Sequence, residues 1–189
     1  NDGSTGYELW AHNTSNHSTW RVADIDVGSG SVPGLNMQIL IGDTIYFDAD
    51  DGSTGRELWA HDASNHSTWQ VADIYTGGNG NVGATMSILV GDTLYFDADE
   101  GTGPELWAHD TSNHSTWQVT DIRIGNGGSG PGQYMDLLIG DTLYFSAIDG
   151  QSGQELWAHD TSNHSTWKAA DIIRGVTGRT HGHYIGLIV

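Results

Sequence analysis

The sequence predicts an all-β protein made of four repeated units, and three observations lead to this expectation. First, the strings ELWAH and SNHSTW each occur four times along the 189 residues. Second, the tryptophans of the four ELWAH strings recur at intervals of 49, 48 and 50 residues. Third, 27 glycines, eight tryptophans and seven tyrosines accompany only three prolines, which is typical of many short strands joined by turns. A period near 49 residues suits a four-stranded blade, so the sequence predicts a β-propeller of four blades.

One repeat shows how the four strands are expected to follow one another. Residues 86–90 form a short apolar run, and a glycine-aspartate turn leads from it into a second strand over 93–97. A third strand over 105–109 and a fourth over 116–122 follow, each after a turn-forming segment. The glycine-rich stretch 124–132 is expected to cross from the outer strand of one blade to the inner strand of the next. Both faces of the strands carry large apolar side chains, as expected for a blade packed between two neighbours.

The repeats predict a single propeller domain over residues 1–189. Complete units are expected at 26–74, 75–122 and 123–172, with 1–25 and 173–189 joined in the closing blade. The second-strand string, GDT followed by Ile or Leu and then YF, occurs only three times, so the closing blade would lack one interior strand. Three interpretations stay open: the chain is a piece of a larger propeller, a C-terminal piece is missing, or the last blade pairs differently. An open blade edge would also allow homo-oligomers to form.

Four short motifs characterise the unit: Leu94-Tyr95-Phe96, Asp51-Gly52, Glu57-Leu58-Trp59 with Asp62, and Asp73-Ile74. With these motifs the chain resembles the ELWxxDGT repeat family of bacterial and archaeal secreted proteins. The sequence departs from the D-G-T of that family, which is replaced by Asp62-Ala63-Ser64 in one copy and Asp110-Thr111-Ser112 in another. The resemblance implies propeller blades on an exported or surface protein, and it implies no chemistry.

The charge of the chain excludes several classes of partner. Twenty-four Asp and Glu residues against six Lys and Arg give a formal charge of −18. This charge would repel phosphate backbones and anionic lipids, so a nucleic-acid partner is excluded. The absence of cysteine removes disulfides, thiolate metal sites and cysteine nucleophiles. Membrane insertion is not expected, because no apolar run approaches the roughly 20 residues that span a bilayer. With the resemblance, these features predict a secreted or cell-surface protein.

The acidic turns after the second strands are candidate calcium sites. Clustered carboxylates can supply several of the oxygen ligands that Ca²⁺ prefers. The alternative is a solvated hairpin turn in which Asp and Gly serve the backbone geometry. In the last copy Ser146 and Ile148 replace two of the acidic residues. The candidate ligands are Asp48, Asp50, Asp51, Asp97 and Asp99.

Two histidines flank each turn between the third and fourth strands, as His61 and His66 do. A two-residue turn at Ala63-Ser64 would place these histidines directly opposite each other, with Cβ atoms about 5 Å apart. That geometry suits two ligands of a zinc or nickel ion, but a complete site needs about four ligands. The alternative is a polar hairpin tip.

The same hairpins combine aromatic and polar groups in a way that favours carbohydrate binding. A sugar site needs a flat aromatic face and planar side chains that hydrogen-bond hydroxyl groups, and four copies would add avidity to weak sites. The alternative is that the tryptophans pack between blades. The candidate ligand-binding residues are Trp10, His12, Asn16, Trp59, His61, Asn65, Trp107, His109, Asn113, Trp157, His159 and Asn163.

An enzyme is not expected, because the polar residues of interest recur in nearly every copy whereas catalysis needs one asymmetric site. The leading interpretation is a multivalent, lectin-like propeller with glycans or other surface ligands as partners and calcium as a candidate cofactor. The alternative is a structural or adhesion module of a surface protein that binds no small molecule.

Overall fold

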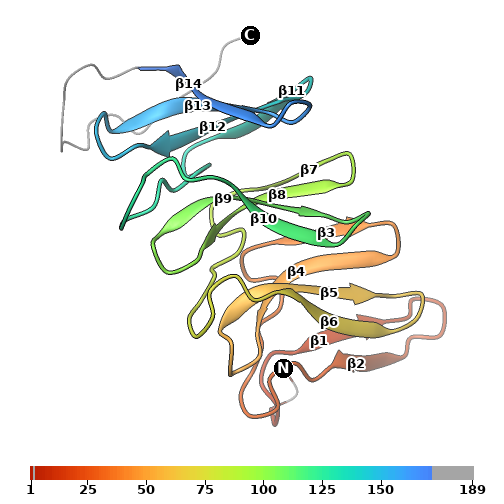
Figure 1. Ribbon diagram of the computed structural model, residues 1–189. Coiled ribbons are helices and arrows are strands. Elements are labelled where there is room, and N and C mark those ends of the chain that lie inside the picture. The colour runs from red at the N-terminus through yellow and green to blue at the C-terminus, as the bar shows by residue number, and fades with distance from the viewer. Residues whose placement is uncertain (2, 172–189) are drawn as a thin grey trace. The chain divides into compact units, whose positions relative to one another are not determined.

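The computed structural model describes residue 1 and residues 3–171. In this part of the chain, fourteen strands form one two-stranded and three four-stranded antiparallel sheets (Figure 1). The predicted all-β class and the repeated four-stranded sheets are therefore confirmed. The predicted role of residues 173–189 in a closing blade lies outside the described residues. No helix in the described residues has the length and apolar character needed to cross a membrane.

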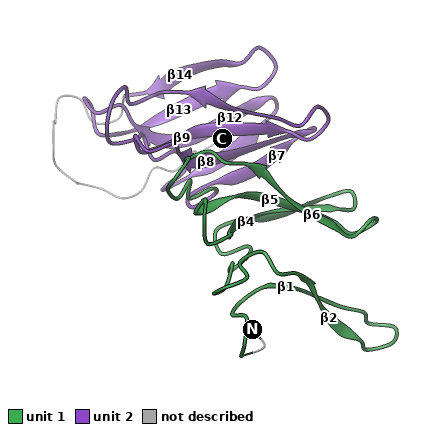
Figure 2. Ribbon diagram, turned by 60° about the horizontal axis from the view of Figure 1, so that its bottom comes forward, with its two compact units in different colours: residues 1–82 green, residues 83–189 purple. Residues whose placement is uncertain are grey.

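The chain divides into two compact units, residues 1–82 and residues 83–189 (Figure 2). The first unit contains a two-stranded and a four-stranded sheet. Its strands are β1 (Leu9–His12), β2 (Thr19–Ala23), β3 (Gln38–Ile41), β4 (Thr44–Asp50), β5 (Arg56–Asp62) and β6 (Ser67–Ala72). Within each sheet every strand pairs with the next one in sequence, so β1–β2 is a hairpin and β3–β6 is a meander.

The second unit contains two four-stranded meanders, β7–β10 and β11–β14. The first comprises β7 (Ser87–Val90), β8 (Thr93–Asp99), β9 (Pro104–Asp110) and β10 (Ser115–Thr120). The second comprises β11 (Asp136–Ile139), β12 (Thr142–Ile148), β13 (Gln154–Asp160) and β14 (Ser165–Ala170). Each four-stranded sheet of the protein thus falls inside one of the three complete repeats expected from the sequence.

The turn between the first two strands of each meander depends on a glycine. Gly42, Gly91 and Gly140 begin two-residue turns and have φ angles of 59°, 59° and 60°. Glycine adopts this left-handed conformation without a Cβ clash, and the conformation matches the twist of a two-residue hairpin. The GDT string therefore sets the register of the first strand pair.

The hydrophobic core of the second unit lies between its two sheets. Alternate residues along a strand point to the same face. The core comprises Met86, Tyr95, Leu106, Ala108 and Ile122 on one side, and Leu143, Phe145 and Ala147 from β12 on the other. Burial of a large side chain such as Phe145 contributes roughly 1.5–3 kcal/mol. Trp117 and Trp157 pack against this core, so two of the repeated tryptophans lie between sheets.

Candidate functional site

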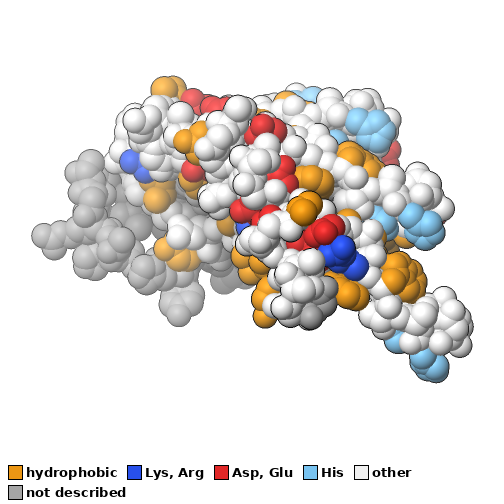
Figure 3. Space-filling view, turned by 90° about the horizontal axis from the view of Figure 1, so that it is seen from below, with side chains coloured by type: hydrophobic (Ala, Val, Ile, Leu, Met, Phe, Trp, Pro, Cys, Tyr) orange, Lys and Arg blue, Asp and Glu red, His pale blue; other side chains and the backbone are white. Residues whose placement is uncertain are grey.

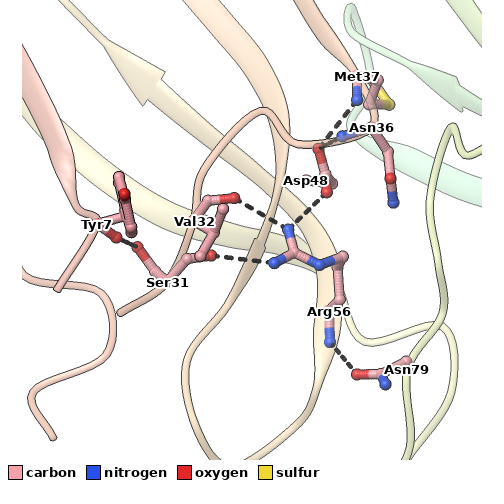
Figure 4. Close-up of polar contacts among 8 residues, drawn as sticks. All are labelled: Tyr7, Ser31, Val32, Asn36, Met37, Asp48, Arg56 and Asn79. Atoms are coloured by element: carbon pink, nitrogen blue, oxygen red, sulfur yellow. Dashed lines mark hydrogen bonds and ion pairs between the residues drawn. The ribbon is translucent and has the colours of Figure 1, made fainter. Parts of the chain in front are cut away.

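Asp48, a predicted metal ligand, lies on β4 and is fully buried. Its Oδ1 accepts hydrogen bonds from the backbone N–H groups of Asn36 and Met37 at 2.9 and 3.0 Å (Figure 4). Its Oδ2 forms an ion pair with Nη1 of Arg56 at 2.7 Å. The Asp48 carboxylate is thus occupied on both oxygens by donors of the protein itself.

Arg56 is a structural residue that the sequence reasoning missed. Its side chain is 13% exposed, and its Nη1 also donates to the carbonyl of Val32 at 3.0 Å. The backbone N–H of Arg56 donates to Oδ1 of Asn79 at 2.9 Å (Figure 4). The available signal was a single basic residue at a position where the next repeats carry Pro104 and Gln154, in a chain with only six Lys and Arg.

The other two meanders keep an oxygen acceptor at the position of Asp48, as a carboxylate in one and as a hydroxyl in the other. Oδ1 of Asp97 accepts the N–H groups of Thr85 and Met86, each at 2.9 Å. Burial raises the pKa of Asp97. In the last repeat, the hydroxyl of Ser146 accepts the N–H of Tyr134 at 3.0 Å. The shared requirement at this position is therefore an oxygen that caps the chain entering the first strand.

The three remaining predicted metal ligands form hydrogen bonds within their own turns. Oδ1 of Asp50 accepts the N–H of Gly52 at 2.8 Å, and Oδ1 of Asp51 accepts the N–H of Thr54 at 2.7 Å. In the next repeat, Oδ1 of Asp99 accepts the N–H groups of Gly101 and Gly103 in its own turn, at 2.7 and 2.8 Å. Within residues 1 and 3–171, no group of three or more His, Asp or Glu side chains is arranged to hold a metal ion. These contacts agree with the alternative considered for the sequence, in which the acidic residues serve the backbone geometry of the turn.

The turn after β4 also borders a shallow polar hollow of about 290 Å³. Asp50 is its only charged lining residue, and backbone and small side chains supply the rest. The lining residues are Asp50, Gly52, Ser53, Gly55, Gly77, Gly78 and Asn79. This hollow lacks the aromatic face that a sugar site needs.

In the first three repeats, the glutamate of the ELW motif holds the linker that leaves its own repeat. Glu57 is 0% exposed, and its carboxylate accepts the N–H groups of Ile74 and Gly80, both at 2.8 Å. Burial raises the pKa of Glu57 to about 7. Glu105 holds its linker by accepting the N–H groups of Ile122 and Arg123 and the hydroxyl of Ser129. Glu8 does the same with the N–H groups of Ile25 and Ser31 and the hydroxyl of Ser31. Each of these glutamates therefore forms a joint, meaning a hydrogen-bonded contact between the ELW segment of a repeat and the linker that leaves the same repeat.

The hairpin between the third and fourth strands has a longer loop than the sequence analysis predicted. Asp62 pairs with Ser67 and His61 pairs with Thr68, so residues 63–66 form a four-residue loop. His66 ends the loop with φ of 61°, in the left-handed region where Asn, Asp and His are enriched. The expected opposition of His61 and His66 across a two-residue turn is therefore wrong.

The two histidines of each pair lie in different environments in the three meanders. His61, His109 and His159 are 5%, 0% and 0% exposed. The Nδ1 atom of each lies 2.8–2.9 Å from a threonine hydroxyl on the adjacent strand. The second histidine of each pair is exposed at the hairpin tip, and Figure 3 shows histidine side chains at the surface. The buried members are therefore part of the packing between strands.

The asparagines of the predicted sugar site stabilise the hairpin tips. Nδ2 of Asn65 donates to Oδ2 of Asp62 at 2.7 Å, and its Oδ1 accepts the N–H of Ser67 at 2.9 Å. Asn113 and Asn163 make the same two kinds of contact. Both polar ends of these amides are thus used inside the tip.

The tryptophans of the third strands are half-buried in the meanders. The indole Nε1 atoms of Trp59, Trp107 and Trp157 are buried and have no hydrogen-bond partner among the described residues. Nζ of Lys168 lies 5.7 Å from the ring centroid of Trp157. A sugar hydroxyl could not reach these buried indole nitrogens without displacing their neighbours.

Among the described residues, only the first repeat exposes all three members of the predicted sugar site. Trp10 is 39% exposed, and His12, two residues further on β1, is exposed on the same face. The rings of His12 and His17 have their centroids 6.2 Å apart. Asn16 is exposed at the tip, where its Oδ1 accepts the N–H of Ser18 at 3.0 Å.

The buried histidines predict that acid destabilises the second unit. Burial, reinforced by the neighbouring tip histidines, lowers the pKa values of His109 and His159 to about 4. The unfolded chain binds these protons near pH 6.5, so the stability that the two groups contribute is complete above that pH and is lost as the pH falls towards 4. Shifts of this size correspond to about 3 kcal/mol for each histidine.

Urea unfolding between pH 4 and pH 7 measures this loss, and a His159→Gln variant should show a flatter pH profile in the second unit. Glu57 has the opposite sign in the first unit, because its pKa is raised to about 7. Its contribution is complete below pH 4.5 and is lost as the pH rises through 7. An unchanged pH profile in the His159→Gln variant would contradict the assignment.

The fold and these contacts define an all-β protein of repeated, propeller-type sheets. No family model matches the chain, and no curated protein matches it. Similar solved structures include a puromycin hydrolase, with a TM-score of 0.54 and 10% identity over 80% of this chain and 22% of that chain. A puromycin-hydrolyzing peptidase of Mycobacterium tuberculosis has a TM-score of 0.51 and 11% identity over 77% of this chain and 21% of that chain.

An oligogalacturonate lyase in complex with manganese has a TM-score of 0.50 and 14% identity over 87% of this chain and 42% of that chain. The chain spans about a fifth of the length of the two hydrolases and less than half of the lyase. These proteins contain propeller domains, and at this level of identity the likeness concerns the fold alone.

Proposed function

We propose that the chain is a non-enzymatic structural repeat module of an exported or surface protein. The observation that carries this proposal is that the repeated polar side chains are used within the protein. Asp48 caps the first strand, Glu57 holds the linker, and Asn65 closes the hairpin tip. Groups that recur because they build each repeat need no ligand to explain their recurrence.

The proposed arrangement is a four-bladed propeller, whole or as part of a larger one, in which each meander is one blade. Two observations support it: the near-49-residue period and the packing of tryptophans between the sheets of the second unit. The resemblance to the ELWxxDGT repeats supports an extracellular location. The charge of −18 favours solubility and disfavours association with anionic surfaces.

Carbohydrate binding at the first repeat is the second candidate function. The observation that favours it is the exposure of Trp10 beside His12 and Asn16, which offers an aromatic face with polar neighbours. In this proposal calcium would order an acidic turn and would not contact the sugar. The expected site is single, in contrast to the four equivalent sites that the sequence suggested.

A glycan array with the labelled protein, read once in calcium and once in EDTA, separates the two candidates. The structural module predicts no specific binding in either buffer. Carbohydrate binding at the first repeat predicts a signal that Trp10→Ala abolishes. Trp20→Ala is the matched control, because Trp20 is similarly exposed, at 42%, but lies on the other face of the β1–β2 hairpin. Binding that both variants retain would contradict a site at Trp10.

A further inference from the structure

The chain contains two Asn-Gly sequences, in the linkers that follow the first two meanders. They are Asn79-Gly80, after β6, and Asn126-Gly127, after β10. The asparagine of such a sequence can lose ammonia, because glycine has no Cβ to hinder attack by its backbone nitrogen on the preceding side chain. Both asparagines are exposed, so the difference between the two sequences lies in the nitrogen that must attack.

The nitrogen of Gly80 is buried against a carboxyl group. Its N–H donates to Oε1 of Glu57 at 2.8 Å, and a Cβ on Gly80 would lie 2.5 Å from Oε2 of Glu57. Burial raises the pKa of Glu57 to about 7, so this group is mostly ionised at pH 8. Its negative charge opposes the loss of the Gly80 proton that the attack requires. Oδ1 of Asn79 is held by the backbone N–H of Arg56 at 2.9 Å (Figure 4).

The nitrogen of Gly127 lies in the opposite environment. Its N–H donates to the carbonyl of Thr102 at 2.6 Å, and both residues are exposed. A hydrogen bond between exposed groups opens at a small local cost in free energy. Nη1 of Arg123 donates to the carbonyl of Gly127 at 3.1 Å, and a Cβ on Gly127 would lie 2.8 Å from the guanidinium carbon. This positive charge favours loss of the Gly127 proton.

We propose that Asn126 is a site of spontaneous deamidation and that the fold protects Asn79 from the same reaction. The nitrogen of Gly127 gives its proton to hydroxide and forms a bond to Cγ of Asn126, and Nδ2 takes up a proton and leaves as ammonia. Water then opens the succinimide ring at either of its carbonyl groups, which gives aspartate or isoaspartate. Water and hydroxide are the only co-reactants, so no enzyme is required. The inference does not depend on the proposed function.

The product would change the linker close to a joint. The hydroxyl of Ser129, two residues after Gly127, donates to Oε2 of Glu105 at 2.6 Å. Isoaspartate lengthens the backbone by one methylene group before this contact. Both products also place a new negative charge in the segment that Arg123 contacts. Deamidation at Asn126 would therefore alter the second unit and leave the linker of the first unit unchanged.

The experiment incubates the whole protein at pH 8 and follows both asparagines by peptide mapping with mass spectrometry and isoaspartate detection. We expect Asn126 to convert at least about tenfold faster than Asn79, because the Gly80 nitrogen must first leave a buried contact. In protein unfolded by guanidinium chloride, the two sequences should react at similar rates. Asn126→Gln is the matched control, because glutamine would have to form a larger ring and should abolish the fast conversion.

Variants at Arg123 separate the effect of charge from that of structure. Arg123→Gln should slow the conversion of Asn126 about threefold, because the positive charge is lost. A guanidinium that only holds the loop in place would have the opposite effect, since its removal would loosen the loop and speed the reaction. Arg123→Lys keeps the charge and should react at nearly the original rate. Faster conversion in Arg123→Gln would therefore contradict the electrostatic part of the proposal.

Two results with the unaltered protein would overturn the proposal as a whole. One is conversion of Asn79 as fast as that of Asn126 in the folded state. The other is an Asn126 that stays intact in the folded protein while the unfolded chain reacts. Neither result depends on the folding of a variant.

Discussion

Replacing Arg56 by glutamine is expected to lower the free energy of unfolding of the first unit by about 3–5 kcal/mol. The substitution leaves the carboxylate of Asp48 fully buried without its positive partner, and it removes a donor from the carbonyl of Val32. Breaking a buried pair on one side is costly because the remaining charge has no solvent around it. Urea unfolding followed by tryptophan fluorescence gives the total loss. Hydrogen exchange in residues 26–50 assigns the loss to the first unit.

The last repeat provides the compensating change. It carries Ser146 and Gln154 at the positions of Asp48 and Arg56, and the serine hydroxyl caps the first strand in place of the carboxylate. The double variant Asp48→Ser, Arg56→Gln should therefore be more stable than Arg56→Gln alone, because no buried charge remains. A double variant that is less stable than the single one would contradict this account.

A second ion pair serves as the control. Lys168 and Asp149 form it with side chains 27% and 17% exposed, so water screens it more than the Arg56 pair. Lys168→Gln is expected to cost less than about 1 kcal/mol. A loss as large as that of Arg56→Gln would mean that burial is not what makes the Arg56 pair important.

Replacing Glu105 by alanine is expected to lower the free energy of unfolding of the second unit by about 3 kcal/mol. The carboxylate accepts the N–H groups of Ile122 and Arg123 at 3.1 and 3.2 Å, and the hydroxyl of Ser129 at 2.6 Å. Without it, three donors lose their acceptor, and two of them belong to the buried residues Ile122 and Ser129. Faster hydrogen exchange in residues 121–130 would locate the effect.

Glu105→Gln should cost less than Glu105→Ala, because an amide oxygen still accepts one or two of these hydrogen bonds. Glu100, which is exposed in the turn before β9, is the matched control. Glu100→Ala should leave the stability of the second unit within about 0.5 kcal/mol of the original. Equal losses at both positions would show that charge, and not the linker contact, is responsible.

The strand order could be predicted from the sequence because it depends on local signals. A glycine at each two-residue turn and an apolar alternation on each strand are visible without tertiary information. The tip loop could not be predicted in the same way. Its length depends on His66 in a left-handed conformation, and a Ser-Asn sequence before it is compatible with loops of more than one length.

The candidate site was harder to predict than the fold, because the donors that a carboxylate contacts depend on the tertiary structure. Asp48 lies within β4, two residues before its end, and accepts hydrogen bonds from residues 11 and 12 positions earlier. A sequence shows the acidic cluster and not these donors. The replacement of the aspartate by Ser146 was the useful signal, because serine is a poor calcium ligand and a good hydrogen-bond acceptor.

The joints formed by Glu8, Glu57 and Glu105 have a consequence for how such a chain can change its length. Glu57 and Glu105 bind the start of the linker that follows their own sheet, so these repeats direct their outgoing chain with their own residues. A whole repeat duplicated in the gene would bring its joint with it, and neither neighbour would have to evolve a new one. Recombination in steps of one repeat is therefore the change that this architecture tolerates best, whereas a cut between a glutamate and its linker would separate a joint from its partner.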